Sequence, residues 1–248
     1  MSTPGALPLV LIPALLCDEA LYRDVLTALH DGRDTRVMVA SHPEMRDSVA
    51  AILDAAPERF VLAGSSYGGT VAIEVALAAP ERVSALWLNG CDPGASNRDG
   101  NLGLASLLET ATEAAVGYLA SVVVRPQASA AADAFRDMAH RTGGTVGGAQ
   151  ARALAARTDA WDRLAALTMP TLLIWGEQDA AIPVAVGQRL AAALPNARLH
   201  VLPECGHLPT LERPHEVAGL VREWMRGVAP TGSVAPRRPD GDAGGTLT

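Results

Sequence analysis

Short apolar runs alternate with longer amphipathic stretches along most of the chain. Six of the apolar runs are rich in Leu, Val and Ile, and we expect strands at residues 7–12, 36–40, 59–63, 83–88, 171–175 and 198–202. Apolar residues between them recur at helical spacing, which predicts helices at residues 19–29, 46–55, 68–79, 184–194 and 216–225. The strands are too apolar to alternate, so we expect an α/β fold with about six mostly parallel strands and helices on both faces.

The alternation breaks once, at residues 92–167, which we call the cap segment. Ala-rich stretches of helical character occupy 102–121, 128–141 and 150–167, with a Gly-rich break between the last two. We expect the cap segment to lie above the sheet and over a ligand pocket, as an insertion into one α/β core made of residues 1–91 and 168–228. Residues 229–248 are Pro, Gly, Asp and Ser without periodicity, which predicts a disordered tail.

Composition narrows the class of protein. The chain has 248 residues, 49% of them apolar, which is enough for one α/β domain with a substantial core. A net charge of −7 without any basic cluster argues against nucleic acid as a partner, and no segment has the roughly 20 apolar residues of a membrane span. The three cysteines are an odd number without metal-like spacing, which favours a reduced, cytoplasmic protein without a metal site. Cys17 and Cys205 are expected to be small buried side chains. The oligomeric state is not indicated.

The run Gly64-Ser65-Ser66-Tyr67-Gly68-Gly69 stands between a predicted strand and a predicted helix. A G-x-S-x-G pattern in that context is typical of a nucleophile elbow, a sharp turn that exposes one serine at the top of a sheet. Gly64 and Gly68 are needed because side chains there would collide with the neighbouring strand or helix. The pattern predicts Ser66 as a nucleophile.

A serine hydroxyl needs a base to take its proton and an acid to orient that base. Asp179 follows the strand at 171–175, and His207 follows the strand at 198–202. The order Ser, Asp, His along the chain is the one expected for an α/β-hydrolase triad. Asp92, which follows the strand at 83–88, is the alternative acid.

With these motifs the chain resembles the α/β-hydrolase superfamily, and more narrowly the small bacterial esterase-like hydrolases that carry a Leu-Ile-Pro-x-Leu-Leu-Cys-Asp segment, here residues 11–18. The resemblance covers about residues 7–227. It implies Ser66 as nucleophile, His207 as general base and then acid, and Asp179 as orienting carboxylate. The elbow makes the backbone N–H of Tyr67 one oxyanion donor. By resemblance the second donor is Leu15 N–H, although Ala14 stands where relatives usually have glycine.

The cap segment contains the candidate residues for lining a substrate pocket and for binding a charged group of the substrate. Three aromatic residues are expected to line a substrate pocket or to pack in the core: Tyr118, Phe135 and Trp161. Three arginines are candidates either for binding a substrate carboxylate or for solvated helix faces: Arg125, Arg141 and Arg152.

Together these features predict a serine hydrolase that needs no cofactor, forms an acyl-enzyme with a small-molecule carboxylic ester or lactone, and uses water as second substrate. Several alternatives use the same scaffold: a carbon–carbon bond hydrolase, a thioesterase, a cyclase or lyase, and a ligand-binding receptor that retains the triad.

Overall fold

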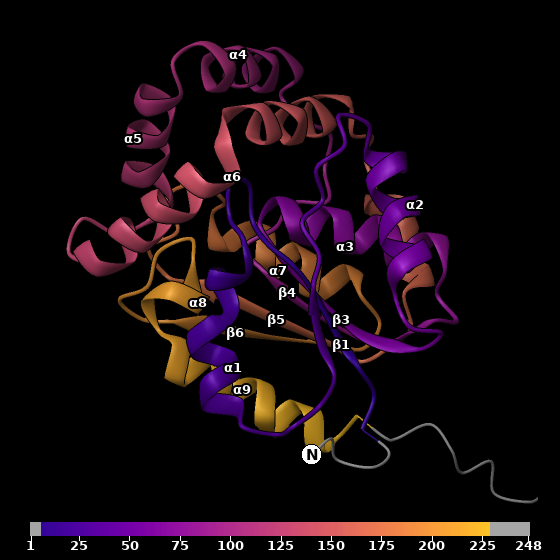
Figure 1. Ribbon diagram of the computed structural model, residues 1–248. Coiled ribbons are helices and arrows are strands. Elements are labelled where there is room, and N and C mark those ends of the chain that lie inside the picture. The colour runs from indigo at the N-terminus through magenta and orange to yellow at the C-terminus, as the bar shows by residue number, and fades with distance from the viewer. Residues whose placement is uncertain (1–5, 229–248) are drawn as a thin grey trace, which may run out of the picture.

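The computed structural model describes residues 6–228. Its centre is a six-stranded sheet, around which the helices are arranged (Figure 1). The strand order is β2-β1-β3-β4-β5-β6, and every neighbouring pair is parallel. The strands are β1 (Leu9–Ile12), β2 (Thr35–Val37), β3 (Phe60–Ser65), β4 (Val83–Asn89), β5 (Thr171–Gly176) and β6 (Ala197–Leu202). All six predicted strands and the predicted fold class are confirmed. The disorder expected at 229–248 concerns residues outside those described.

Helices cover both faces of the sheet, as the apolar strands require. One face packs against α1 (Arg23–Leu29) and α9 (Pro214–Arg226), and the other against α2 (Met45–Ala55), α3 (Tyr67–Ala78) and α7 (Val184–Ala193). In β1, Leu9 and Leu11 join the first core cluster, while Val10 and Ile12 join the second. The predicted helix at 19–29 begins as the 3-10 turn η1 (Glu19–Tyr22), and a short helix, α8 (Pro209–Glu212), precedes α9.

The cap segment lies between β4 and β5 and differs in detail from the helices expected for it. It contains α4 (Arg98–Thr110), α5 (Thr112–Val123), α6 (Ser129–Ala156) and η2 (Trp161–Ala166). The stretch at 102–121 is two helices, because Ala111 adopts φ −147° and ψ 55°. The break expected at 142–148 is confined to a kink at Gly143, with φ 80° and ψ 158°, and the stretch expected from 150 to 167 leaves the helix after Ala156.

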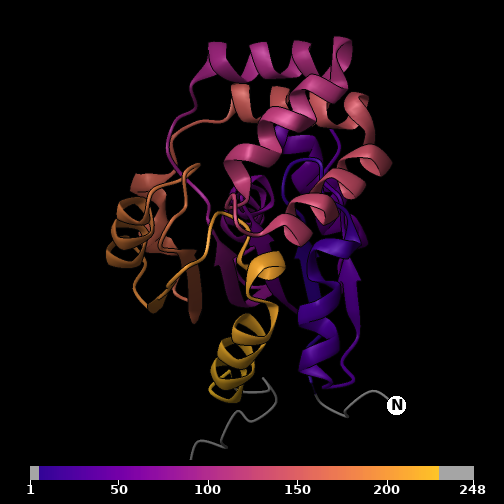
Figure 2. The same cartoon turned by 90° about the vertical axis from the view of Figure 1, so that its left-hand side faces the viewer.

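The cap helices gather at one end of the molecule. Figure 2 shows α4 across the top with α6 beneath it, while α9 lies at the other end. Loops that follow β1, β3 and β6 meet α4, α5 and α6 around one cavity, so the cap segment covers the carboxyl ends of these strands. Ligands of open parallel sheets bind at that edge. No helix among residues 6–228 has the length and apolar character to cross a membrane.

Candidate active site

Ser66 occupies the turn between β3 and α3 in a backbone conformation that side chains rarely adopt. Its φ is 52° and its ψ is −119°. Such strain persists only where the surroundings enforce it, and it concentrates at functional sites. A Cβ atom at Gly64 would lie 2.3 Å from the carbonyl oxygen of Gly68, and one at Gly68 would lie 2.1 Å from that of Ile12. Both positions therefore require glycine, as the motif predicts.

The imidazole of His207 lies between a hydroxyl and a carboxylate. Its Nε2 is 2.8 Å from Ser66 Oγ, and its Nδ1 is 2.8 Å from Asp179 Oδ2. An ionised carboxylate only accepts, so Nδ1–H donates to Asp179 and leaves Nε2 free to accept the Ser66 hydroxyl proton. The His207 and Asp179 side chains are almost completely buried, 2% and 0% exposed. This tautomer is the one in which an imidazole acts as a base towards serine.

Two aspartates follow strands near this site, and only one reaches the histidine. The second oxygen of Asp179, Oδ1, accepts the backbone N–H groups of Ala181 and Ile182 at 2.9 and 2.8 Å, which fixes the carboxylate in its loop. Asp92 instead faces Arg157 at 3.5 Å, and its Oδ1 accepts the N–H of Gly94. The geometry thus favours the sequence-based choice of Asp179.

The two residues expected to supply the oxyanion N–H groups are Tyr67, which follows Ser66 in the chain, and Leu15, which lines the same cavity as Ser66. Tyr67 is the first residue of α3, where N–H groups lack partners within the helix and the helix dipole favours an anion. Leu15 lies in the turn after β1 and lines the same cavity as Ser66. The next N–H, that of Leu16, is occupied, because it donates to Gln150 Oε1 at 2.9 Å. Sequence reasoning missed Gln150, which carries no motif.

Ser66 and His207 open into a cavity of about 250 Å³. Apart from these two, the cavity is lined almost entirely by apolar side chains, most of them from the cap segment: Ala14, Leu15, Asn101, Leu104, Leu119, Val122, Val123, Phe135, Leu154, Ala181, Ile182 and Leu208. Phe135 is thus at the cavity, as expected. The structure does not bring Tyr118 and Trp161 there, because Tyr118 is 62% exposed and Trp161 stacks on the guanidinium of Arg189 at 3.8 Å.

The three cap arginines are paired with carboxylates of the protein itself. Arg125 Nε donates to Glu212 Oε2 at 2.9 Å, Arg141 Nε donates to Asp18 Oδ2 at 2.7 Å, and Arg152 pairs with Glu109. None of the three lines the cavity.

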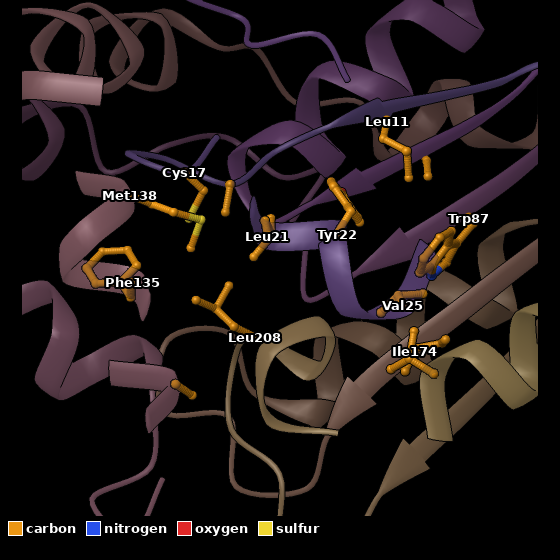
Figure 3. Packing of buried hydrophobic residues seen from close by; sticks show 14 of the residues in the cluster. Leu11, Cys17, Leu21, Tyr22, Val25, Trp87, Phe135, Met138, Ile174 and Leu208 are labelled. Carbon is orange, nitrogen blue, oxygen red and sulfur yellow. The ribbon is translucent and has the colours of Figure 1, made fainter. Parts of the chain in front are cut away.

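The cysteines are buried, free thiols in the described part of the chain. Figure 3 shows Cys17 packed beside Met138 in the core cluster, and Cys205 belongs to the same cluster. Burial raises the pKa of Cys205 to about 12 and that of Cys17 further, with Glu212 and Asp18 nearby adding to the respective shifts. Thiols held in the protonated form are not nucleophiles, which agrees with their interpretation as packing residues.

A parallel sheet with a strained serine elbow, and with a histidine and a carboxylate on later strand ends, defines the class of α/β hydrolases. The chain belongs to the alpha/beta hydrolase family, whose model matches residues 10–220. The resemblance noted in the sequence is thereby confirmed at the level of the family.

Curated relatives include enzymes of two reaction types. The chain is 31% identical over 198 residues to a pimeloyl-acyl-carrier-protein methyl ester esterase of Aromatoleum aromaticum, covering 71% of this chain and 78% of that protein. It is also 31% identical over 180 residues to a 2-hydroxy-6-oxononadienedioate/2-hydroxy-6-oxononatrienedioate hydrolase of Cupriavidus pinatubonensis, covering 68% of this chain and 62% of the relative. Among solved structures, a thermophilic esterase from Thermogutta terrifontis has a TM-score of 0.81 at 22% identity, with 90% of each chain covered. That likeness concerns the fold.

Proposed function

We propose that the protein is a serine hydrolase that cleaves a carboxylic ester or lactone through an acyl-enzyme. The observation that carries the proposal is the position of His207, hydrogen bonded to both Ser66 and Asp179 at 2.8 Å. Ser66 Oγ attacks the carbonyl carbon while His207 Nε2 takes its proton. His207 then returns that proton to the departing alcohol, and water attacks the acyl-enzyme by the reverse proton path. Asp179 holds the tautomer and stabilises the imidazolium.

The tetrahedral intermediate carries its negative charge on the former carbonyl oxygen. We assign the stabilisation of this oxyanion to hydrogen bonds from the backbone N–H groups of Tyr67 and Leu15. Tyr67 follows Ser66 in the chain and Leu15 lines the same cavity, and each aimed donor is worth about 3 kcal/mol of barrier in comparable enzymes. The α3 dipole adds to the stabilisation at Tyr67.

The cavity favours an uncharged, apolar substrate. The lining residues include no arginine or lysine, and the cap arginines are neutralised by Glu212, Asp18 and Glu109. A substrate carboxylate in this cavity would lose its hydration without gaining an ion pair, which is costly. The cap segment supplies much of the cavity lining, including Leu104, Leu119, Val122 and Phe135. We therefore assign to the cap segment the specificity for the acyl or alcohol group of the substrate.

Carbon–carbon bond hydrolysis is the second candidate, because one set of relatives carries that type of name. The relative from Cupriavidus is described as acting on a dioate, which has two carboxylates. The apolar cavity suits such a substrate poorly, whereas the name of the Aromatoleum relative, a methyl ester esterase, agrees with an ester substrate.

We also propose that the protein works in the reducing environment of the cytoplasm. The three cysteines, which are free thiols in the described part of the chain, support this location.

Labelling and turnover test the proposal together. A fluorophosphonate should attach to Ser66, and tryptic peptides of the wild type should carry the label while those of Ser66→Ala should not. Ser66→Ala, His207→Ala and the double variant should be about equally inactive, since the residues act as one unit. A panel of neutral esters, lactones, thioesters and dioate β-diketones then separates the candidates. An unlabelled Ser66 in a folded protein would refute the serine mechanism. If dioates were the best substrates, carbon–carbon bond hydrolysis would replace ester hydrolysis as the proposed reaction.

A further inference from the structure

The loop after β1 adopts a conformation that its own residues do not favour. Leu16 has a φ of 62°, in the left-handed region where non-glycine residues are uncommon. The loop offers no glycine at this turn, since it reads Pro13-Ala14-Leu15-Leu16. Contacts from elsewhere in the fold must therefore hold it.

One buried side chain of the cap segment supplies these contacts. Gln150 of α6 is only 1% exposed. Its Oε1 accepts the N–H of Leu16 at 2.9 Å, and its Nε2 donates to the carbonyl of Ala40 at 2.9 Å. The Gln150 amide thereby links the loop after β1 to the segment after β2, and both its oxygen and its nitrogen are hydrogen bonded.

The backbone of α6 also packs directly on this loop. A Cβ atom at Gly147 would lie 2.5 Å from Cδ2 of Leu16, which is itself fully buried. On the other side of the kink at Gly143, Arg141 donates two hydrogen bonds to the carboxylate of Asp18, from Nε to Oδ2 at 2.7 Å and from Nη2 to Oδ1 at 3.2 Å. The loop is therefore held against the cap helix at two points.

We propose that Gln150 is a positioning residue for the oxyanion site. By holding the N–H of Leu16, Gln150 fixes the Leu15–Leu16 peptide. That restrains the backbone of Leu15, whose own N–H belongs to the preceding peptide and is our candidate oxyanion donor in the cavity that Leu15 shares with Ser66. The assembly of the oxyanion site would thus depend on the docking of α6, which couples the cap segment to chemistry as well as to specificity. This inference rests on the proposed serine hydrolase function.

The rival explanation is that Gln150 only satisfies two buried backbone groups and so stabilises the fold. Both explanations predict a loss of stability when the amide is removed. They differ in turnover, because a misdirected oxyanion donor weakens binding of the transition state more than binding of the ester.

Gln150→Met, which keeps the length of the side chain and removes both hydrogen bonds, is the main test. We expect kcat to fall about 10- to 100-fold with KM changed less than about 3-fold. The second-order rate of fluorophosphonate labelling at Ser66 should fall in parallel. Amide hydrogen exchange in the peptide around Leu16 should become faster. If this variant does not fold, Gln150→Asn serves instead, since it keeps the amide but is one methylene too short to reach both partners.

Phe60→Leu is the stability control, because Phe60 is buried at the opposite end of β3 from Ser66. At an equal loss of Tm it should leave kcat unchanged. A kcat of Gln150→Met within 2-fold of the wild type, or no lower than that of the control, would overturn the positioning role. A wild type that neither labels at Ser66 nor cleaves esters would refute the proposed function and with it this role. The hydrogen exchange would still report whether Gln150 holds the loop.

Discussion

The carboxylate of Asp179 contacts Nδ1 of His207 at 2.8 Å, although the two residues follow different strands. Both side chains are excluded from solvent, which strengthens their interaction and keeps the imidazole in one orientation. Asp92, the other aspartate at a strand end, is turned towards Arg157.

Asp179→Asn should therefore preserve the fold and lower kcat by up to about 10⁴, because the amide favours the wrong imidazole tautomer. Asp92→Asn is the matched control and should change kcat by less than about 10-fold. Steady-state kinetics on one neutral ester, with Tm recorded for each variant, make the comparison. A reversed order of the two effects would assign the acid role to Asp92.

Substitution of Phe135 should change which ester is accepted. Phe135 lines the cavity and is 2% exposed, so Phe135→Leu enlarges the space beside Ser66. We expect kcat/KM for bulky relative to short acyl groups to rise about 10-fold, the usual scale for one altered apolar contact. Tyr118→Ala removes an aromatic residue of the same segment that is 62% exposed, and it should leave this ratio unchanged. Equal ratios in both variants and the wild type would remove Phe135 from the specificity determinants.

The elements and the catalytic candidates were predictable from local patterns. Ser66, Asp179 and His207 each follow an apolar run, and in a parallel sheet the ends of such runs meet at one edge. Their roles stay predictions until tested. Local signal was also enough for the strands, because the four central ones, β1, β3, β4 and β5, are apolar and buried almost throughout. The edge strands β2 and β6 carry a weaker pattern, with Arg36 and Arg198 exposed.

The contacts within the cap segment were not predictable in the same way. On Ala-rich helices the apolar face is poorly marked, so the sequence did not distinguish Phe135, which faces the cavity, from Tyr118, which faces solvent. Gln150 lies in a run of Gly and Ala, and its two partners are 134 and 110 residues away along the chain. Only tertiary structure brings these groups together.

The thiols should resist modification in the native protein. Burial raises the pKa of Cys17, Cys91 and Cys205, so the reactive thiolate is scarce at pH 8 as well as inaccessible. We expect iodoacetamide at pH 8 to leave turnover intact and all three thiols to react only after unfolding, as counted by mass spectrometry. Rapid loss of activity with carboxamidomethylated Cys205 in the folded protein would contradict this.

The pair formed by Asp18 and Arg141 should make stability depend on pH in the acid range. Burial alone would raise the pKa of Asp18, but the hydrogen bonds from Arg141 and from the N–H of Ala20, together with the positive charges of Arg141 and Arg23, lower it overall. A carboxyl whose pKa is lower in the folded state stabilises fully above its unfolded pKa of about 3.9 and loses that contribution as pH falls through the folded value.

Asp18→Asn should therefore lower Tm by about 1 to 3 °C at pH 7, the scale of a partly exposed ion pair, and the difference from the wild type should shrink progressively as pH falls below about 4 and through the folded pKa of Asp18. Asparagine still accepts the N–H of Ala20, so the change keeps that contact and removes the charge pair together with the hydrogen bond from Arg141 Nε. Arg141→Gln should lower Tm by a similar amount, and the double variant should lose no more Tm than either single variant. A double-mutant cycle built from Tm values at pH 7 and at pH 3 measures this coupling. A difference that persists unchanged at pH 3 would mean that packing, and not the charge pair, joins this loop to α6.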